Sequence, residues 1–286
     1  MPLFGAHMSV AGGVHNALID ARNHACETVQ LFTKNANQWL ARDQTEDEVE
    51  LFRGTLRETR LRFPTAHTSY LINLASPNDA LFLRSVEALV VEMRRAERLG
   101  LAYLVLHPGA HIDSGEEAGL TRVARALDEV HERCPGFGVK ILLETTAGQG
   151  SCLGHRFEHL ARILGLVADP SRLGVCLDTC HVFAAGYPLF PKADYRATLR
   201  AFDDRIGLER LLLFHVNDSL KPLGSRVDRH AHIGRGELGL EPFRLLVNDP
   251  RFRDLPMILE TAKEEGDEKD MDSMNLATLR SLMAPR

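Results

Sequence analysis

Short apolar runs alternate with amphipathic stretches along almost the whole chain. The runs are three to six residues long, which suits buried strands and is too short for helices. We predict strands at Leu3–Ala6, Thr28–Phe32, Tyr103–Leu106, Val139–Leu143, Leu173–Leu177, Leu211–Val216 and Met257–Leu259, with a less regular one just before His67.

The stretches between these runs have the spacing of surface helices. Thr45 and Glu48 form a capping-box pattern, and Val49, Phe52 and Leu56 then fall on one helical face. Further helices are predicted around Val86, Val90 and Met93 up to Gly100, and over Glu116–His131, Phe157–Leu166, Tyr195–Ile206 and Ser273–Met283. Strands that alternate with helices imply right-handed crossovers and a parallel sheet.

About eight strands in this length favour a single α/β domain over residues 1–286, a closed (β/α)₈ TIM barrel. An open doubly wound sheet is the alternative. The turn after the first strand contains Ala11–Gly13 but lacks the G-x-G-x-x-G pattern, so nothing there indicates a dinucleotide site.

Composition narrows the class of protein further. The chain has 286 residues, of which 44% are apolar and 26% charged, the proportions of an ordinary globular protein. No apolar run is long enough to span a bilayer, and the first residues lack the pattern of a secretory signal. Five cysteines at irregular spacings do not form a disulfide framework. We therefore expect a cytoplasmic protein with no membrane partner.

The net charge argues weakly against nucleic-acid binding, because 34 Lys and Arg stand against 39 Asp and Glu, a balance of −5. Its distribution points the other way. Between residues 219 and 236, Lys221, Arg226, Arg229 and Arg235 are accompanied by Asp228 alone, whereas residues 264–272 are acidic.

Six consecutive predicted strands have His, Glu or Asp at their carboxyl end. These residues are His67, His107, Glu144, Asp178, His215 and Glu260. Active sites of such barrels lie where the strands end, at the carboxyl face. Polar side chains gathered there need a shared partner, and a cation is the simplest one.

Two loops add three further nitrogen and oxygen donors, His181, Asp228 and His230. Imidazole with carboxylate suits zinc or manganese. Sites with several metal ions recur in phosphoryl chemistry, because they bind both the attacking and the leaving oxygen.

The remaining histidines and the cysteines have simpler interpretations. His7 also ends a strand, and its role as ligand or as support for a ligand stays open. We expect His232 to support the site from behind, and Cys176 and Cys180 to be small buried thiols. The histidines expected in solvent are His15, His24, His111, His131, His155 and His159.

Seven motifs resemble those of the endonuclease IV family, the metal-dependent apurinic/apyrimidinic (AP) endonucleases. They are Gly5–Gly13, Leu31–Asn35, His67–Leu74, Leu177–Gly186, His215–Ser219, Asp228–Gly234 and Leu259–Thr261, and together they span almost the whole chain.

The resemblance implies a (β/α)₈ barrel with three zinc ions. At one or more of the three sites, Mn²⁺ is an alternative to zinc. Carried over motif by motif, the first ion takes His67, His107 and Glu144, the second Glu144, Asp178, His215 and Glu260, and the third His181, Asp228 and His230. Glu144 would bridge the first two ions and help orient the attacking water, which makes it the expected catalytic residue.

The family hydrolyses duplex DNA on the 5′ side of an abasic site, leaving a 3′-hydroxyl and a 5′-deoxyribose phosphate, and it removes blocking groups from 3′ ends. The expected partner is therefore double-stranded DNA with either lesion, bound by a monomer. An abasic nucleotide costs less to extrude from the duplex than an intact one.

The resemblance places Tyr70 and Leu71 as a wedge in the minor groove, for which core packing is the alternative interpretation. Gln38 would enter the base stack from the other side. Asn37 stands where some family members have arginine, and Arg235 stands where another residue is often found, with Arg229 in the same basic loop as a further DNA contact.

Two other functions are weighed against this one. A sugar isomerase or epimerase on a related barrel also has Glu, Asp and His at strand ends, but it requires neither the His181, Asp228 and His230 group nor a wedge. A DNA-damage or zinc-binding module without catalysis would have no need of a three-metal cluster.

Overall fold

Eight parallel strands close into a barrel in the computed structural model, which describes residues 1–266 and 269–285. The strands follow the spatial order β1-β10-β7-β6-β5-β4-β3-β2, and β2 pairs with β1 to complete the ring. Their bounds are β1 Leu3–His7, β2 Thr28–Phe32, β3 Thr65–His67, β4 Tyr103–Leu106, β5 Lys140–Glu144, β6 Leu173–Asp178, β7 Leu211–His215 and β10 Pro256–Leu259. The (β/α)₈ prediction is confirmed, and the open-sheet alternative is wrong.

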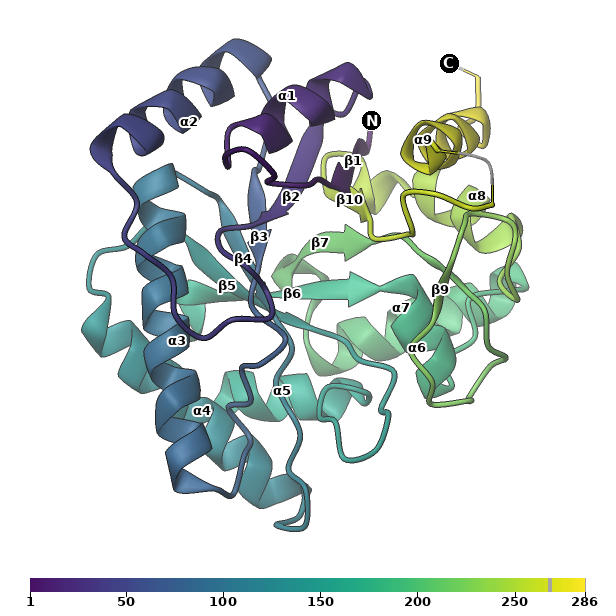
Figure 1. Ribbon diagram of the computed structural model, residues 1–286. Helices are drawn as coiled ribbons and strands as arrows, with labels where there is room; N and C mark the ends of the chain where they lie inside the picture. The colour runs from purple at the N-terminus through teal and green to yellow at the C-terminus, as the bar shows by residue number, and fades with distance from the viewer. Residues whose placement is uncertain (267–268, 286) are drawn as a thin grey trace.

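Helices surround this barrel on its outside (Figure 1). They are α1 Asn16–Asn23, α2 Glu46–Thr59, α3 Asp79–Leu99, α4 Glu116–Arg133, α5 Phe157–Leu166, α6 Thr179–Ala185, α7 Lys192–Arg205, α8 Glu241–Val247 and α9 Met271–Ser281. Short 3₁₀ turns at Pro170–Arg172, Leu208–Arg210 and Pro250–Phe252 precede β6, β7 and β10. In the described ranges no helix is long and apolar enough to cross a membrane.

The predicted helix signals are present. Thr45 accepts a hydrogen bond from the Glu48 amide at 3.3 Å, and the Glu48 carboxylate accepts one from the Thr45 amide at 2.9 Å, so the capping box opens α2. Gly100 adopts φ 75°, a left-handed conformation that costs glycine little, and ends α3. Helix α6 escaped prediction because the residues from Thr179 to Ala184 are all buried, which removes any polar face.

The core has two parts. A large apolar layer lies between the barrel and the helices, and a small cluster on the strands is separate from it. The small cluster consists of Val105, Leu142, Cys176, Leu213 and Ile258. Each of these precedes one strand-end polar residue by two positions: His107, Glu144, Asp178, His215 and Glu260. Alternate residues of a strand point to the same side of the strand. The strand-end side chains therefore point inward, as the residues of the small cluster do.

Three histidines differ from their predicted exposure. His131, His155 and His159 are buried rather than solvated. His131 lies on the inner face of α4, and burial lowers the pKa of its imidazole to about 4. His159, on α5, accepts a hydrogen bond from the Gly154 amide at 3.1 Å, and so ties the preceding loop to the helix. The cysteines are free thiols, and Cys176 and Cys180 are buried as predicted.

Candidate metal centre and nucleic-acid interface

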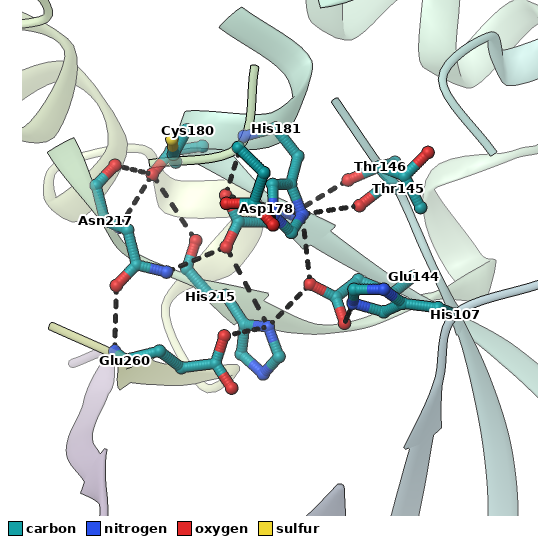
Figure 2. A network of polar contacts seen from close by, with 12 residues as sticks. His107, Glu144, Thr145, Thr146, Asp178, Cys180, His181, His215, Asn217 and Glu260 are labelled. Carbon is teal, nitrogen blue, oxygen red and sulfur yellow. Dashed lines mark hydrogen bonds and ion pairs between the residues drawn. The ribbon is translucent and has the colours of Figure 1, made fainter. Parts of the chain in front are cut away.

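Glu144 is the hub of a polar network at the carboxyl ends of the strands (Figure 2). The end of β5 places it inside the barrel with no exposed surface. Its Oε2 lies 3.1 Å from Nε2 of His67 and 2.9 Å from Nε2 of His107. Its Oε1 lies 3.0 Å from Nδ1 of His215 and 3.2 Å from Nδ1 of His181. One carboxylate therefore contacts four of the predicted imidazole ligands.

Asp178 and Glu260 flank His215 on neighbouring strands. The Nδ1 atom of His215 lies 3.2 Å from Oε2 of Glu260 and 4.0 Å from Oδ2 of Asp178. Asn217 joins the two acids, because its Nδ2 donates to Oδ2 of Asp178 at 2.7 Å and its Oδ1 accepts from the Glu260 amide at 2.8 Å. Sequence reasoning did not select Asn217, which lies two residues beyond His215.

The third predicted group comes from loops rather than strand ends. His181 lies in the first turn of α6, and His230 opens β9, a two-residue strand (His230–Ala231) paired with β8 (Asp218–Ser219). The two carboxylate oxygens of Asp228 lie 3.1 Å from Nε2 of His181 and 3.4 Å from Nε2 of His230. His230 also lies 3.6 Å from Asp178, so the nine predicted ligands form one connected cluster.

Asp218 anchors the loop that carries Asp228 and His230. Its buried carboxylate accepts hydrogen bonds from the backbone amides of Ser219, Gly234, Gly236 and Leu238, at 2.7, 3.0, 3.0 and 2.9 Å. The start of the β8–β9 hairpin and the segment that follows β9 are thereby tied to one side chain. A cluster ligand taken from a loop needs such an anchor, since loops are otherwise the more mobile part of a fold.

The charges in the cluster are mutually dependent. Burial acts to raise the pKa of the Glu144 carboxyl, but His107 and His215 hold that pKa well below its usual value. Burial likewise opposes the charged form of His181, yet Asp178 and Asp228 raise the pKa of its imidazole well above the usual value. For Asp228, burial is outweighed by His181, which lowers the carboxyl pKa to about 2. The carboxyl groups of Glu144 and Asp228 are thus ionised, and their negative charge favours cations in the cluster.

The donor set fits divalent cations. The buried Nε2 atoms of His181 and His230 have no hydrogen-bond partner within residues 1–266 and 269–285, although Asp228 lies beside both. Buried nitrogen atoms that make no hydrogen bond are costly, and a cation among these side chains would accept the lone pairs of the neutral rings. Imidazole and carboxylate without thiolate are ligands that zinc and manganese accept.

Gln30 is a residue of this region that sequence reasoning missed. It lies fully buried in the middle of β2, and its Oε1 lies 2.8 Å from Nε2 of His215. Its Nε2 donates to Oε1 of Glu260 at 2.5 Å and lies 3.0 Å from Nδ1 of His7. His7 thus contacts the cluster through Gln30 and Glu260. A polar residue inside an otherwise apolar strand was the available signal.

A cleft of about 610 Å³ opens beside the cluster, and Tyr70, His107, His181, Asp228 and Arg229 are among its lining residues. Tyr70 is 63% exposed, so the core-packing alternative is wrong for this residue. Its ring centroid lies 5.6 Å from that of His67. Leu71, beside it, is half-buried.

The other predicted DNA contacts lie on exposed loops. Asn37 and Gln38 are exposed in the turn that follows β2. Arg229 is exposed and donates to the Asp228 carbonyl at 2.6 Å, whereas Arg235 is paired with Glu265. The acidic segment 264–272 noted in the sequence includes residues 267 and 268, which lie outside the described residues.

The remaining histidines do not join the cluster. His232 is buried, and its Nδ1 lies 2.9 Å from Nδ2 of Asn275 on α9. Glu116, His155 and His159 form a separate group, but Arg226 contacts His155 and Arg156 contacts His159. Two guanidinium groups at this place disfavour a second cation.

Comparison with known proteins bears on the fold and the family of this chain. Residues 18–280 match the family described as xylose isomerase-like TIM barrel. A protein of Chloroflexus aurantiacus named "Probable endonuclease 4" is 51% identical over 283 residues, covering 99% of each chain. The crystal structure of endonuclease IV from Thermus thermophilus superimposes with a TM-score of 0.86 at 36% identity, covering 98% of each chain.

A D-tagatose 3-epimerase-like protein has a TM-score of 0.74 at 18% identity, covering 98% of this chain and 96% of its own. That likeness shows the barrel fold alone. By contrast, this chain shares about half of its residues with an endonuclease 4 relative over nearly the full length of both chains, and identity at that level shows the family. This chain belongs to the endonuclease IV family.

Proposed function

We propose that this chain hydrolyses the phosphodiester bond on the 5′ side of AP sites in duplex DNA and clears blocking groups from 3′ ends. The observation that carries the proposal is the cluster of nine predicted ligands with Glu144 at its centre, in a chain that is 51% identical to a probable endonuclease 4. The reaction would take place in the cytoplasm, and the protein would act on DNA as a monomer.

We assign the cluster to three zinc ions, with Mn²⁺ as a substitute at one or more of them. His67, His107 and Glu144 would hold the first, Glu144, Asp178, His215 and Glu260 the second, and His181, Asp228 and His230 the third. Such ions supply Lewis-acid activation of water and neutralise charge at the reacting phosphate.

The hydrolysis forms a bond between a water oxygen and phosphorus, and it breaks the bond between phosphorus and the 3′-oxygen of the preceding nucleotide. One proton of the water is lost to the surroundings, and the leaving 3′-oxygen takes up a proton to become the 3′-hydroxyl. Glu144 is suited to orient the water, because its ionised carboxylate is fixed by four imidazoles. No serine or cysteine nucleophile is required.

Recognition of the lesion is assigned to side chains around the cleft. Tyr70 is largely exposed beside His67, as a side chain that enters the duplex must be. Leu71 would accompany it in the minor groove, and Gln38 and Asn37 would enter from the other side. Arg229 and Arg235 would contact phosphates, with Arg235 exchanging its bond to Glu265 for one to DNA.

The test is incision of a 5′-labelled duplex with one tetrahydrofuran abasic analogue, beside an undamaged duplex. The analogue has no aldehyde and cannot be cut by β-elimination. We expect one cut, on the 5′ side of the analogue. The labelled product should end in a 3′-hydroxyl, which is shown by its extension with a DNA polymerase. No cut by protein shown to contain zinc would overturn the proposal and favour the sugar isomerase.

A further inference from the structure

A buried ion pair lies behind the two loops that carry the proposed DNA-inserting side chains. Nζ of Lys34, just after β2, lies 3.3 Å from Oε1 of Glu92, in α3. The side chains of Lys34 and Glu92 are 3% and 1% exposed, so water screens the pair little. Neither residue belongs to the nine predicted ligands.

Lys34 holds the first loop. Its ammonium group donates to the Gln38 carbonyl at 2.6 Å and to the Asn35 carbonyl at 3.5 Å. The Gln38 amide in turn donates to the Asn35 carbonyl at 3.2 Å. The ammonium therefore closes the turn on which Asn37 and Gln38 are exposed.

Glu92 holds the second loop with the same oxygen atom. The Ser69 amide donates to Oε1 of Glu92 at 3.1 Å, one residue before Tyr70. The Ser69 hydroxyl donates to the Ala36 carbonyl at 2.5 Å and accepts from the Leu71 amide at 3.3 Å. Ser69 thus links the second loop to Glu92 and to the first loop at once.

This pair is poorly explained by stability alone. Taking two charges out of water costs several kcal/mol, and an apolar pair of similar volume is often as stable. What an apolar pair lacks is direction, since a carboxylate and an ammonium fix the carbonyl and amide groups that they bond. Here those groups belong to two loops from different strands.

We propose that Lys34 and Glu92 are positioning residues, which hold the 35–38 turn and the 69–71 segment at the spacing needed to enter a duplex with a missing base. The inference rests on the proposed function, because the partner is abasic DNA. Its signature is a weaker interaction with damaged DNA while the metal centre stays complete.

The experiment compares Glu92→Gln and Lys34→Met with wild type, and uses Glu87→Gln as the control. Glu87 lies on the same helix and is 64% exposed in a surface pair with Arg133. Three quantities are measured: KM and kcat for incision of the tetrahydrofuran duplex, the fluorescence of 2-aminopurine opposite the lesion, and zinc per chain. The fluorescence rises when inserted side chains unstack the base.

We expect KM to rise about tenfold in both variants, with kcat changed less than about threefold. The reason is that the substitutions weaken DNA binding but leave the groups that act in the chemical step in place. The fluorescence rise on binding should shrink, whereas zinc per chain stays at the wild-type value. Glu87→Gln should match wild type in all three.

A folded Glu92→Gln with wild-type KM and fluorescence overturns the proposal, and so does a fall in kcat that accompanies loss of zinc. If the charged-pair variants do not fold, Ser69→Ala removes the link between the loops with a change of one atom, and the same rise in KM is expected. Failure of the proposed function is seen separately, because the wild-type protein would then leave the abasic duplex uncut.

Discussion

Replacing Glu144 with glutamine changes one oxygen to an amide nitrogen and removes a negative charge from the centre of the cluster. Each carboxylate oxygen faces two imidazole nitrogens at 2.9 to 3.2 Å. Whichever side the amide nitrogen takes, a donor then faces two imidazoles. Removing one partner of a buried charge pair costs about 3–5 kcal/mol of folding stability. The variant also loses the ionised carboxylate proposed to orient the attacking water, so we expect incision to fall at least about 10³-fold, which corresponds to about 4 kcal/mol of activation free energy.

The same variant should stay folded, because the apolar layers inside and outside the barrel do not involve Glu144. The assay is incision of the abasic duplex at saturating DNA, with circular dichroism and zinc analysis of the same preparation. Glu129→Gln, on the surface of α4, is the matched control. Full activity in a folded Glu144→Gln that retains its zinc would refute the role assigned to this carboxylate.

Four further perturbations have expected outcomes. Gln30→Met removes the hydrogen bonds to His215 and Glu260, so zinc should be lost to a chelator at about tenfold lower chelator concentration, measured by zinc analysis after dialysis. Asp218→Ala frees four backbone amides, and should lower the free energy of unfolding in urea by about 3 kcal/mol and remove one zinc per chain. Chelation of zinc should lower Tm, measured by calorimetry. Zinc retention should weaken as the pH falls, starting above about pH 6.5. The reason is that Asp178 and Asp228 raise the pKa of the His181 imidazole against the effect of burial, so protons compete with the metal for this ring.

Much of the barrel and of the cluster was predictable from strand-end chemistry. A run such as Ile141–Leu143 followed by Glu144 places an acid where the strand leaves the barrel, and five neighbouring strands repeat the arrangement. The apolar residue two positions earlier, such as Leu142, strengthens the inference because it fixes which side of the strand faces inward. The structure brings these predicted ligands together, as the pattern requires.

Other parts had no such signal. Asn217 and Asp218 lie in the motif His215–Ser219, but the strand-end pattern assigns neither a role, because their contacts are with chain segments far away in the sequence. His159 looks like a surface residue of an amphipathic helix, and is buried because Gly154 and the preceding loop fold over it. Lys34 and Glu92 are 58 positions apart, so that only the packing of α3 against the loop after β2 reveals the pair.

The absence of thiols from the nine predicted ligands has a consequence for redox behaviour. Cys176 and Cys180 lie beside the cluster, but burial raises the pKa of each thiol to about 12. Oxidants and alkylating agents attack the thiolate, so both cysteines resist them at neutral pH. Oxidation that ejects zinc from cysteine ligands has no corresponding target among imidazoles and carboxylates. A centre of this composition should keep its ions under oxidising conditions that empty a cysteine-ligated zinc site.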